Sequence, residues 1–570
     1  MMKKIIVIVA VTIAFVGGGY LFVAKNAQTA AEEAIAEIER NIEESIPNSD
    51  FTFGEVSADV FANAAHVSDL ALKVNGETLV NADLLAISGD ELTIKSAELT
   101  GVEGYIKNSD VDLNFSVKSI LVADADIESA NKLIEELKVD PAAAIKAVND
   151  FSIGELDVRG LSFALNEDGK EYLQLNGEVR LVGIKNGAIE ILNMAGSLKD
   201  KSGVFFGDTI DGSLNRINIS GFDFGNLLTA VAMENEQLLI AQLQNGFGIS
   251  AVSIEGLVTN INDEVKANLT NGTIEIVDSV IETFSLTDFG FTHENEKVAL
   301  TIGEAQFKGL DLGFDYFSEE ALIENAVQLY GLTGIGLNNA LFIFEGEEFG
   351  IGELSLTDVA FEDGMLVKSK IALNGIKIPL SLIEEINPSA ARTIETFTGS
   401  ESFTLSFSNS NDLDTEEGTY DTELNFGIEG FAEVKLNAAL AGLDVTQIRK
   451  ASKVNNILEA MEIWGEVSKE LSIASVSLEY TDDQLADVML SEAPDVSQLV
   501  MMSGMQIDMV LGQYPKQADQ LKASIKAFLE GKNGFKVSMN AQSPVKIMDM
   551  QQMFMSGDMA NSIIVAFEGS

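Results

Sequence analysis

The chain has 570 residues, of which 36 are Lys or Arg and 89 are Asp or Glu, so its formal net charge is −53. This charge would repel a phosphate backbone, which argues against nucleic-acid binding. The complete lack of cysteine excludes disulfides, thiolate metal sites and cysteine nucleophiles. With 46% hydrophobic residues the chain can bury extensive apolar surface, so we expect a folded protein rather than a disordered one.

The N-terminus reads as a membrane anchor. "MMKK" precedes residues 5–24, which carry no charge and would span about 30 Å as a helix, the thickness of a bilayer core. Lys3 and Lys4 lie before this segment and several glutamates follow it, so the positive-inside rule places the N-terminus in the cytoplasm. A cleaved signal peptide is the competing interpretation, but no small-x-small cleavage site follows the segment. We therefore expect residues 1–26 to be a cytoplasmic tip and anchor in the inner-membrane lipid bilayer, and the rest to be extracytoplasmic, in a bacterial periplasm or at the cell surface.

A short phrase recurs along residues 27–445. It begins at residues 51, 151, 247 and 349 as "FTFGEV", "FSIGEL", "FGISAV" and "FGIGEL", and a looser copy starts at Leu471. Helical patterns precede most copies, at 27–46, 128–149, 226–244 and 446–469; before the copy at 349, the helix near 319–331 is displaced by an extra strand-like segment. Such a period predicts a body of stacked units, each a helix followed by several strands. We expect the phrase to open each unit's first strand and its glutamates, Glu155 and Glu353, to face solvent.

Apolar and polar residues alternate in the segments between these phrases, which is typical of strands with one face on an apolar surface and one in water. Turn sequences at 166–170 and 185–187 join neighbouring strands closely and favour antiparallel pairing. From Tyr420 to Leu440 the even positions are mostly apolar, over a length unusual for a single strand. The predicted fold is α+β and β-rich: an elongated antiparallel sheet of repeated helix-plus-strand units, one N-terminal transmembrane helix and a mixed α/β C-terminal cap.

Two arrangements fit the apolar side of such a sheet. Helices or a second sheet can cover it completely, or part of it can stay open as a groove for an apolar ligand. The residues expected on this apolar-ligand face are Val111, Leu113, Phe115, Val117, Leu173, Leu175, Leu424, Phe426, Ile428, Val434 and Leu436.

The combination of a short basic tip, one N-terminal span and a body of repeated amphipathic strands resembles the AsmA-like and YdgA-like envelope proteins of bacteria. The AsmA-like resemblance implies an elongated β-groove and a role in lipid movement or outer-membrane homeostasis. It extends over nearly the whole chain as a pattern, without a diagnostic motif, so it implies no functional residue.

Residues 446–570 have a different character, with helical patterns at 446–469 and from Pro515 to about Gly531, followed by a strand pattern. They also hold 11 of the 17 methionines, at or after Met489. Methionine can make adaptable contact surfaces for lipids or partners, but we expect these residues to fill an ordinary helix core.

No catalytic motif is present. His66 and His293 lie in no metal or triad spacing, and "DLDTEEGTYDTE" has its turn glycine, Gly418, one position late for a calcium loop, so we read it as an acidic hairpin loop. The sequence favours a non-enzymatic protein, without cofactor or metal, that binds or conducts lipid or another apolar ligand in envelope homeostasis, with envelope proteins as further candidate partners. The alternative is a structural or adhesive surface scaffold with sealed cores and an acidic exterior.

Overall fold

The computed structural model describes most of the chain from residue 48 onward. The described ranges are 48–59, 64–89, 93–107, 112–126, 152–167, 170–185, 188–202, 208–223, 248–277, 280–311, 333–362, 365–399, 401–452, 457–482, 496–512, 514–530, 534–550 and 563–569, with the single residues 40 and 128. The chain divides into two units, each treated by itself: unit 1 is Met1–Asn295 with Asp311–Leu322, and unit 2 is Glu296–Leu310 with Ile323–Ser570.

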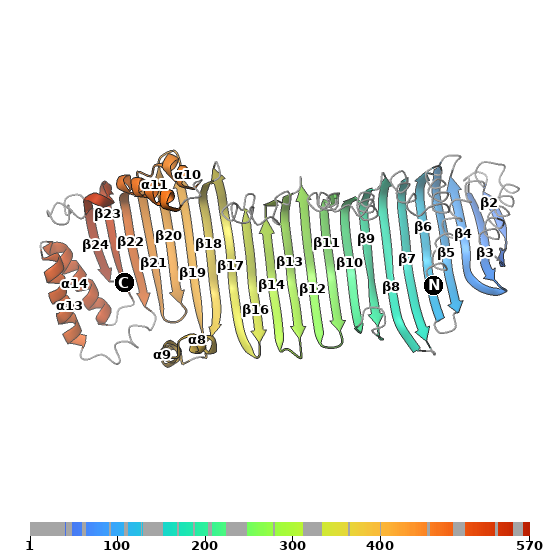
Figure 1. The fold of residues 1–570 in the computed structure, drawn as a ribbon, viewed down its shortest axis with the longest axis horizontal. Coiled ribbons are helices and arrows are strands. Elements are labelled where there is room, and N and C mark those ends of the chain that lie inside the picture. The colour runs from blue at the N-terminus through green and yellow to red at the C-terminus, as the bar shows by residue number, and fades with distance from the viewer. Residues whose placement is uncertain are drawn as a thin grey trace. The chain divides into compact units, whose positions relative to one another are not determined.

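Unit 1 is a run of antiparallel strands in which chain neighbours pair with one another (Figure 1). At the start of the run, β1 and β2 both pair with β3, one after the other along its length. The strands are β1 (Ser49–Thr52), β2 (Val56–Asp59), β3 (Ala64–Val74), β4 (Glu77–Gly89), β5 (Thr93–Lys107), β6 (Asp112–Asp126), β7 (Ser152–Glu167), β8 (Lys170–Lys185), β9 (Ala188–Asp200), β10 (Ile210–Asp223), β11 (Ala251–Ile261), β12 (Val265–Val277) and β13 (Val280–His293).

Unit 2 continues the same antiparallel pattern and adds helices. Its strands are β14 (Val298–Lys308), β16 (Gly334–Phe344), β17 (Glu347–Glu362), β18 (Met365–Pro379), β19 (Ser402–Asp414), β20 (Thr419–Ile428), β21 (Ala432–Ala441), β22 (Ser472–Asp482), β23 (Gly534–Lys546) and β24 (Ile563–Gly569); β15 (Leu310–Asp311) has two residues. Its helices are α8 (Leu380–Ile386), α9 (Pro388–Thr398), α10 (Val445–Ser452), α11 (Ile457–Glu470), α13 (Val496–Leu511) and α14 (Pro515–Leu529). The β-rich, antiparallel character predicted from the alternating pattern is therefore confirmed.

Tight hairpins explain why consecutive strands pair. Asn75 and Gly76 both have positive φ, at 55° and 81°, between Val74 and Glu77, which pair with each other. Two central residues with positive φ match the right-handed twist of the flanking strands, and the Asn-Gly sequence adopts this conformation readily. The predicted turns after β7 and β8 are confirmed as well, because Glu167 pairs with Lys170 and Lys185 with Ala188.

The recurring phrase lies at strand openings, with local differences. Ser152 begins β7 and Ser472 begins β22, directly after Leu471, as predicted. At residue 51 the predicted strand is instead two short strands, because the backbone between β1 and β2 bulges where Gly54 donates to the carbonyl of Ser68. At 349 the phrase lies inside β17, and the expected extra strand before it is β16.

The long alternating segment from Tyr420 to Leu440 is a hairpin, β20 and β21, joined by a turn in which Phe431 donates to the carbonyl of Ile428. Its even positions still share one face, because residues that pair across antiparallel strands point the same way: Phe426 pairs with Val434, and Leu424 with Leu436. The acidic sequence before it forms the predicted hairpin turn, where the Asp414 carboxylate accepts from the amides of Glu416 and Glu417 at 2.9 Å each.

The helices expected at 446–469 and from Pro515 are confirmed as α10, α11 and α14. The predicted anchor and the predicted helices at 27–46, 128–149, 226–244 and 319–331 lie outside the described residues, apart from the single positions 40 and 128. Within the part of the chain that the structure describes, no helix combines the length and apolarity needed to cross a membrane.

A closed hydrophobic core occupies one face of the first strands of unit 1. Its members lie on β1 and β3–β7 and include Val67, Ile94 and Val102, which are 2%, 1% and 4% exposed. Beyond this core, no large apolar side chain between residues 190 and 364 is buried among those described. The apolar side chains on the later strands of unit 1 are therefore more exposed than those on its first strands.

Candidate functional site

Unit 2 has a sheet face on which apolar side chains align in rows across many strands. One row has ten residues, one from each of ten strands, and nine of these residues are apolar. It consists of Phe307, Ile335, Leu356, Ile371, Asn409, Leu424, Leu436, Leu478, Val537 and Phe567. The next row includes Leu373, Phe407, Phe426 and Val434. We call these rows and their same-face neighbours the apolar face of unit 2.

The apolar face of unit 2 is only partly covered. Met365 and Val367, on the same face of β18 as Ile371, are buried at 7% exposed each, but other side chains of this face are open. Phe426 is 42% exposed and Leu478 is 37% exposed, and Phe342 and Phe344, whose rings stack 6.4 Å apart, are 41% and 50% exposed. Side chains with this much accessible apolar surface remain available to a ligand. The opposite face of the same strands is polar, for example at Asn425 and Lys435, which pair directly beside Phe426 and Val434.

Between β19 and β21 the apolar face of unit 2 carries no charged side chain among the described residues. Its polar groups are neutral and bonded to one another: the Tyr420 hydroxyl donates to Asn411 Oδ1 at 2.5 Å and the Thr422 hydroxyl donates to the same oxygen at 2.8 Å. An apolar ligand on this stretch would meet no fixed charge to desolvate. The polar cluster could not be found from the sequence, since it depends on the pairing of β19 with β20.

Unit 1 has a comparable face. Rows such as Val158, Val179, Met194, Ile217 and Ile254 cross β7 to β11. On this apolar face of unit 1, Leu175, Met194 and Leu257 are 39%, 41% and 36% exposed. The face continues from the closed core of the first strands, so it changes from sealed to half exposed within one unit.

The structure places the sequence-predicted residues in two groups. In unit 1, Leu113, Leu165 and Leu173 form one cross-strand row and Phe115, Phe163 and Leu175 form the next. Leu113 and Val117 are buried, at 2% and 6% exposed, whereas Leu173 is half-buried and Leu175 exposed. In unit 2, the predicted residues all lie together on β20 and β21: Leu424, Phe426, Ile428, Val434 and Leu436. Val111 lies outside the described residues.

The methionines of α13 do not fill a core, contrary to expectation. Met501, Met502, Met505 and Met509 are 59%, 46%, 54% and 80% exposed, and they follow one side of the helix. The helix packs on α14, to which it is also tied by an ion pair between Asp508 and Lys522. Its outer side is therefore a further exposed apolar strip.

The recurring glutamates lie on the polar face and are half-buried, each held by a side chain of the following strand. Glu155 accepts from Arg180 at 2.6 Å. Glu353 accepts from Asn374 at 2.9 Å and from Ser355 at 2.9 Å, and these hydrogen bonds lower the pKa of the Glu353 carboxyl. Besides lying on the polar face, these glutamates tie the opening strand to its neighbour.

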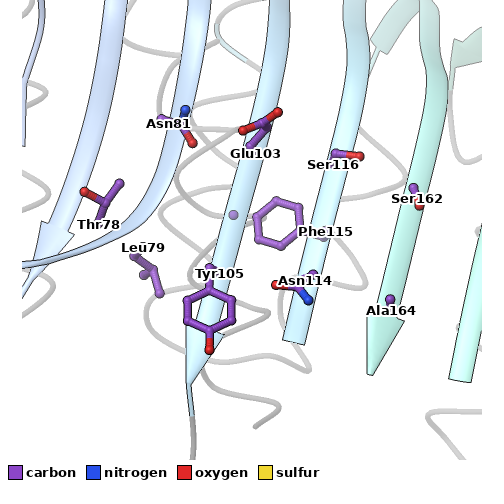
Figure 2. Close-up of a pocket in the computed structure, with 11 residues that line it drawn as sticks. Thr78, Leu79, Asn81, Glu103, Tyr105, Asn114, Phe115, Ser116, Ser162 and Ala164 are labelled. Carbon is purple, nitrogen blue, oxygen red and sulfur yellow. The ribbon is translucent and has the colours of Figure 1, made fainter. Parts of the chain in front are cut away.

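A second candidate site is a hollow of about 440 Å³ on β4–β7 of unit 1, shown in Figure 2. Most of its residues belong to two cross-strand rows on the side of the sheet opposite the closed core. These rows are Asn81, Glu103, Ser116 and Ser162, and Tyr105, Asn114 and Ala164. Thr78, Leu79, Gly104 and Phe115 complete the lining of what we call the polar hollow.

The polar hollow is rich in hydrogen-bonding groups and has little charge. Glu103 is the one charged residue among the described residues of its lining. Partial burial and a hydrogen bond to Asp112 raise the pKa of the Tyr105 hydroxyl, whose ring is 42% exposed. The Ser162 hydroxyl donates to Asn176 Oδ1 at 2.8 Å, so toward the hollow it offers its lone pairs as acceptors.

Comparison with family models gives a match to part of unit 2. A family model described as "Uncharacterized protein" matches residues 425–565, the segment from β20 into β24 that includes α10, α11, α13 and α14. No curated protein matches the chain. The similarity therefore concerns the C-terminal strands and helices of unit 2 and carries no assigned activity.

Proposed function

We propose that this chain is a membrane-anchored, extracytoplasmic, non-enzymatic envelope protein that binds or conducts lipid or another apolar ligand along its half-exposed apolar faces. The observation that supports this most is the exposure of aligned apolar side chains, such as Leu175 in unit 1 and Phe426 in unit 2. Aligned apolar surface of this kind usually marks a binding surface. The charge-free stretch between β19 and β21 suits acyl chains.

The anchor in residues 5–24 and the AsmA-like resemblance support the membrane setting of this proposal. The competing proposal, a structural or adhesive scaffold, is favoured by the closed core on the first strands of unit 1. The two differ in whether the open apolar faces hold a ligand.

Lipid analysis separates them. The full chain, extracted in a mild detergent, is analysed for copurified lipids by mass spectrometry, alongside Phe426→Glu on the apolar face and Lys435→Glu on the opposite face of the same hairpin. We expect lipid on the wild type and on Lys435→Glu, and a severalfold loss on Phe426→Glu because a carboxylate would need to be desolvated under an acyl chain. Equal lipid on all three, or none on any, would support the scaffold.

A further inference from the structure

The polar hollow is formed by side chains of different lengths on β4–β7, and the proposed binding of an apolar ligand does not involve it. Ser116, Ser162 and Ala164 have short side chains, while Glu103 and Tyr105 on the neighbouring strand are longer, so a depression forms beside them (Figure 2). At the base of the hollow, the Phe115 ring lies against the backbone of Gly104, where an added Cβ would come within 1.9 Å of the ring, and Phe115 also packs against the closed core. The other face of these strands packs in the closed core, which fixes the position of the strands that form the depression.

Several polar side chains of the hollow make no hydrogen bond within the part of the chain that the structure describes. Asn81, Glu103, Asn114 and Ser116 have no side-chain hydrogen-bond partner among the described residues. The two amides each offer donors and an acceptor, and the serine hydroxyl offers both. A ligand that brings its own donors and acceptors would satisfy several of these groups at once.

The charges of the hollow select the kind of ligand. Among the described residues that line it there is no lysine or arginine, and Glu103 together with nearby Asp112 gives this part of the hollow a negative charge. A phosphate or carboxylate ligand would be repelled, because no described residue of the lining carries a positive charge that could compensate its own. Since the remaining polar side chains are neutral amides and hydroxyls, a ligand of hydroxyl groups fits better than a cation, which would be served by one carboxylate alone.

The aromatic residues favour a ligand with an apolar side as well. Tyr105 is 42% exposed and lines the hollow, so its ring is accessible to a ligand there. An amphipathic ring of this kind offers an apolar surface beside a polar rim. The volume of about 440 Å³ lies within the range of small-molecule sites.

We propose that the polar hollow binds a neutral saccharide, with Asn81, Asn114 and Glu103 bonding its hydroxyl groups and Tyr105 lying against a ring face. This is a site separate from the apolar faces, and it does not depend on lipid binding. It would give the protein a contact with a neutral glycan of the envelope or of a neighbouring surface.

Isothermal titration calorimetry on the full chain in detergent tests this with maltose, cellobiose and N,N′-diacetylchitobiose, and with glucose 6-phosphate and choline as anionic and cationic probes. We expect at least one neutral disaccharide to bind and glucose 6-phosphate not to bind. Tyr105→Ala and Asn114→Ala should each weaken that binding, by roughly tenfold for the tyrosine. Asn271→Ala, at an exposed asparagine on β12, should leave it unchanged.

Circular dichroism melting of each variant checks that the fold is intact. We expect no change, because the substituted side chains are exposed. Binding of choline or glucose 6-phosphate in preference to all three sugars would overturn the proposal, as would no binding at all or a sugar affinity indifferent to Tyr105→Ala. Lipid content, measured on the same preparations, reports separately on the apolar faces.

Discussion

At the scale of single residues, glycines paired with Asp or Asn keep the apolar side chains on one face. Gly101 on β5 has φ +62°, and a Cβ there would lie 2.0 Å from the Asp83 carboxylate of β4. On either side of it, Leu99 and Val102 both point into the core although they are three positions apart. Gly256 and Asn215 repeat this arrangement on β11 and β10. Each such bulge resets the alternation where the sequence departs from period two.

Replacing Gly101 with alanine should therefore destabilise unit 1. The positive φ costs an L-residue about 1–2 kcal/mol, and displacement of Asp83 adds to this. We expect the urea midpoint, followed by circular dichroism, to fall for Gly101→Ala. Gly212→Ala is the control, because its added Cβ would meet neighbours only at ordinary contact distance and its φ is not positive; an equal loss in both variants would contradict this role for the bulge.

Glu353 provides a pH-dependent prediction. Hydrogen bonds from Asn374 and Ser355 lower its pKa in the folded protein, so the carboxylate contributes stability above the ordinary glutamate pKa and loses it as the pH falls through the folded value. Glu353→Gln should be less stable than wild type at pH 7, by about 1 kcal/mol, and the difference should shrink below about pH 4. Urea unfolding at pH 7 and pH 3.5 measures this; a difference that is constant or grows at low pH would argue against it.

At the scale of elements, α14 joins the sheet of unit 2 through an aromatic cluster. The Phe528 ring meets Tyr480 of β22 and Phe535 of β23 edge-on, at 5.5 and 5.7 Å between ring centroids. The Tyr480 hydroxyl donates to Asp482 at 2.6 Å, and burial together with this hydrogen bond raises its pKa. α14 also packs on β24 and α13 packs on α14, so this cluster is one of the contacts that hold the two helices in place.

Truncating Phe528 to alanine should release the pair of helices while the strands stay folded. The lost burial and ring contacts are worth about 2–3 kcal/mol. Hydrogen exchange followed by mass spectrometry should show faster exchange in α13 and α14 than in β19–β21. The matched variant Lys526→Ala, on the exposed side of α14, should exchange like the wild type; unchanged protection in Phe528→Ala would show that other contacts dock the helices.

The sequence predicts most strands and the two sides of the sheet, since period-two alternation is a local property. The alternation places Phe426 and Val434 on one face. This holds although the segment from Tyr420 to Leu440 is a hairpin rather than a single strand. The bulge at Gly101 was not predicted, because it requires Asp83 of another strand to lie over it. The methionines of α13 were misassigned because composition cannot distinguish an outward helix face from an inward one.

At the scale of the whole molecule, each unit sorts its side chains to two sides. One side carries cross-strand ion pairs such as Arg180 with Glu155 and Lys377 with Glu348, and the other carries the apolar rows. The surplus of acids gives the chain a net charge of −53, which favours hydration of the polar side and opposes association of the apolar sides of different molecules. The polar hollow lies beyond sequence-based prediction, since its residues extend from Thr78 to Ala164 and meet only through the register of four strands.

Site-specific photocrosslinking in cells tests the central claim most directly. A benzophenone amino acid is placed at Leu175, at Phe426 or at Lys435 of the full chain, and crosslinked lipid is detected by mass spectrometry of the purified protein. The half-exposed apolar faces predict lipid adducts at positions 175 and 426 and none at 435, on the opposite face of β21. Adducts at 435 alone, or protein adducts without lipid at 175 and 426, would contradict it.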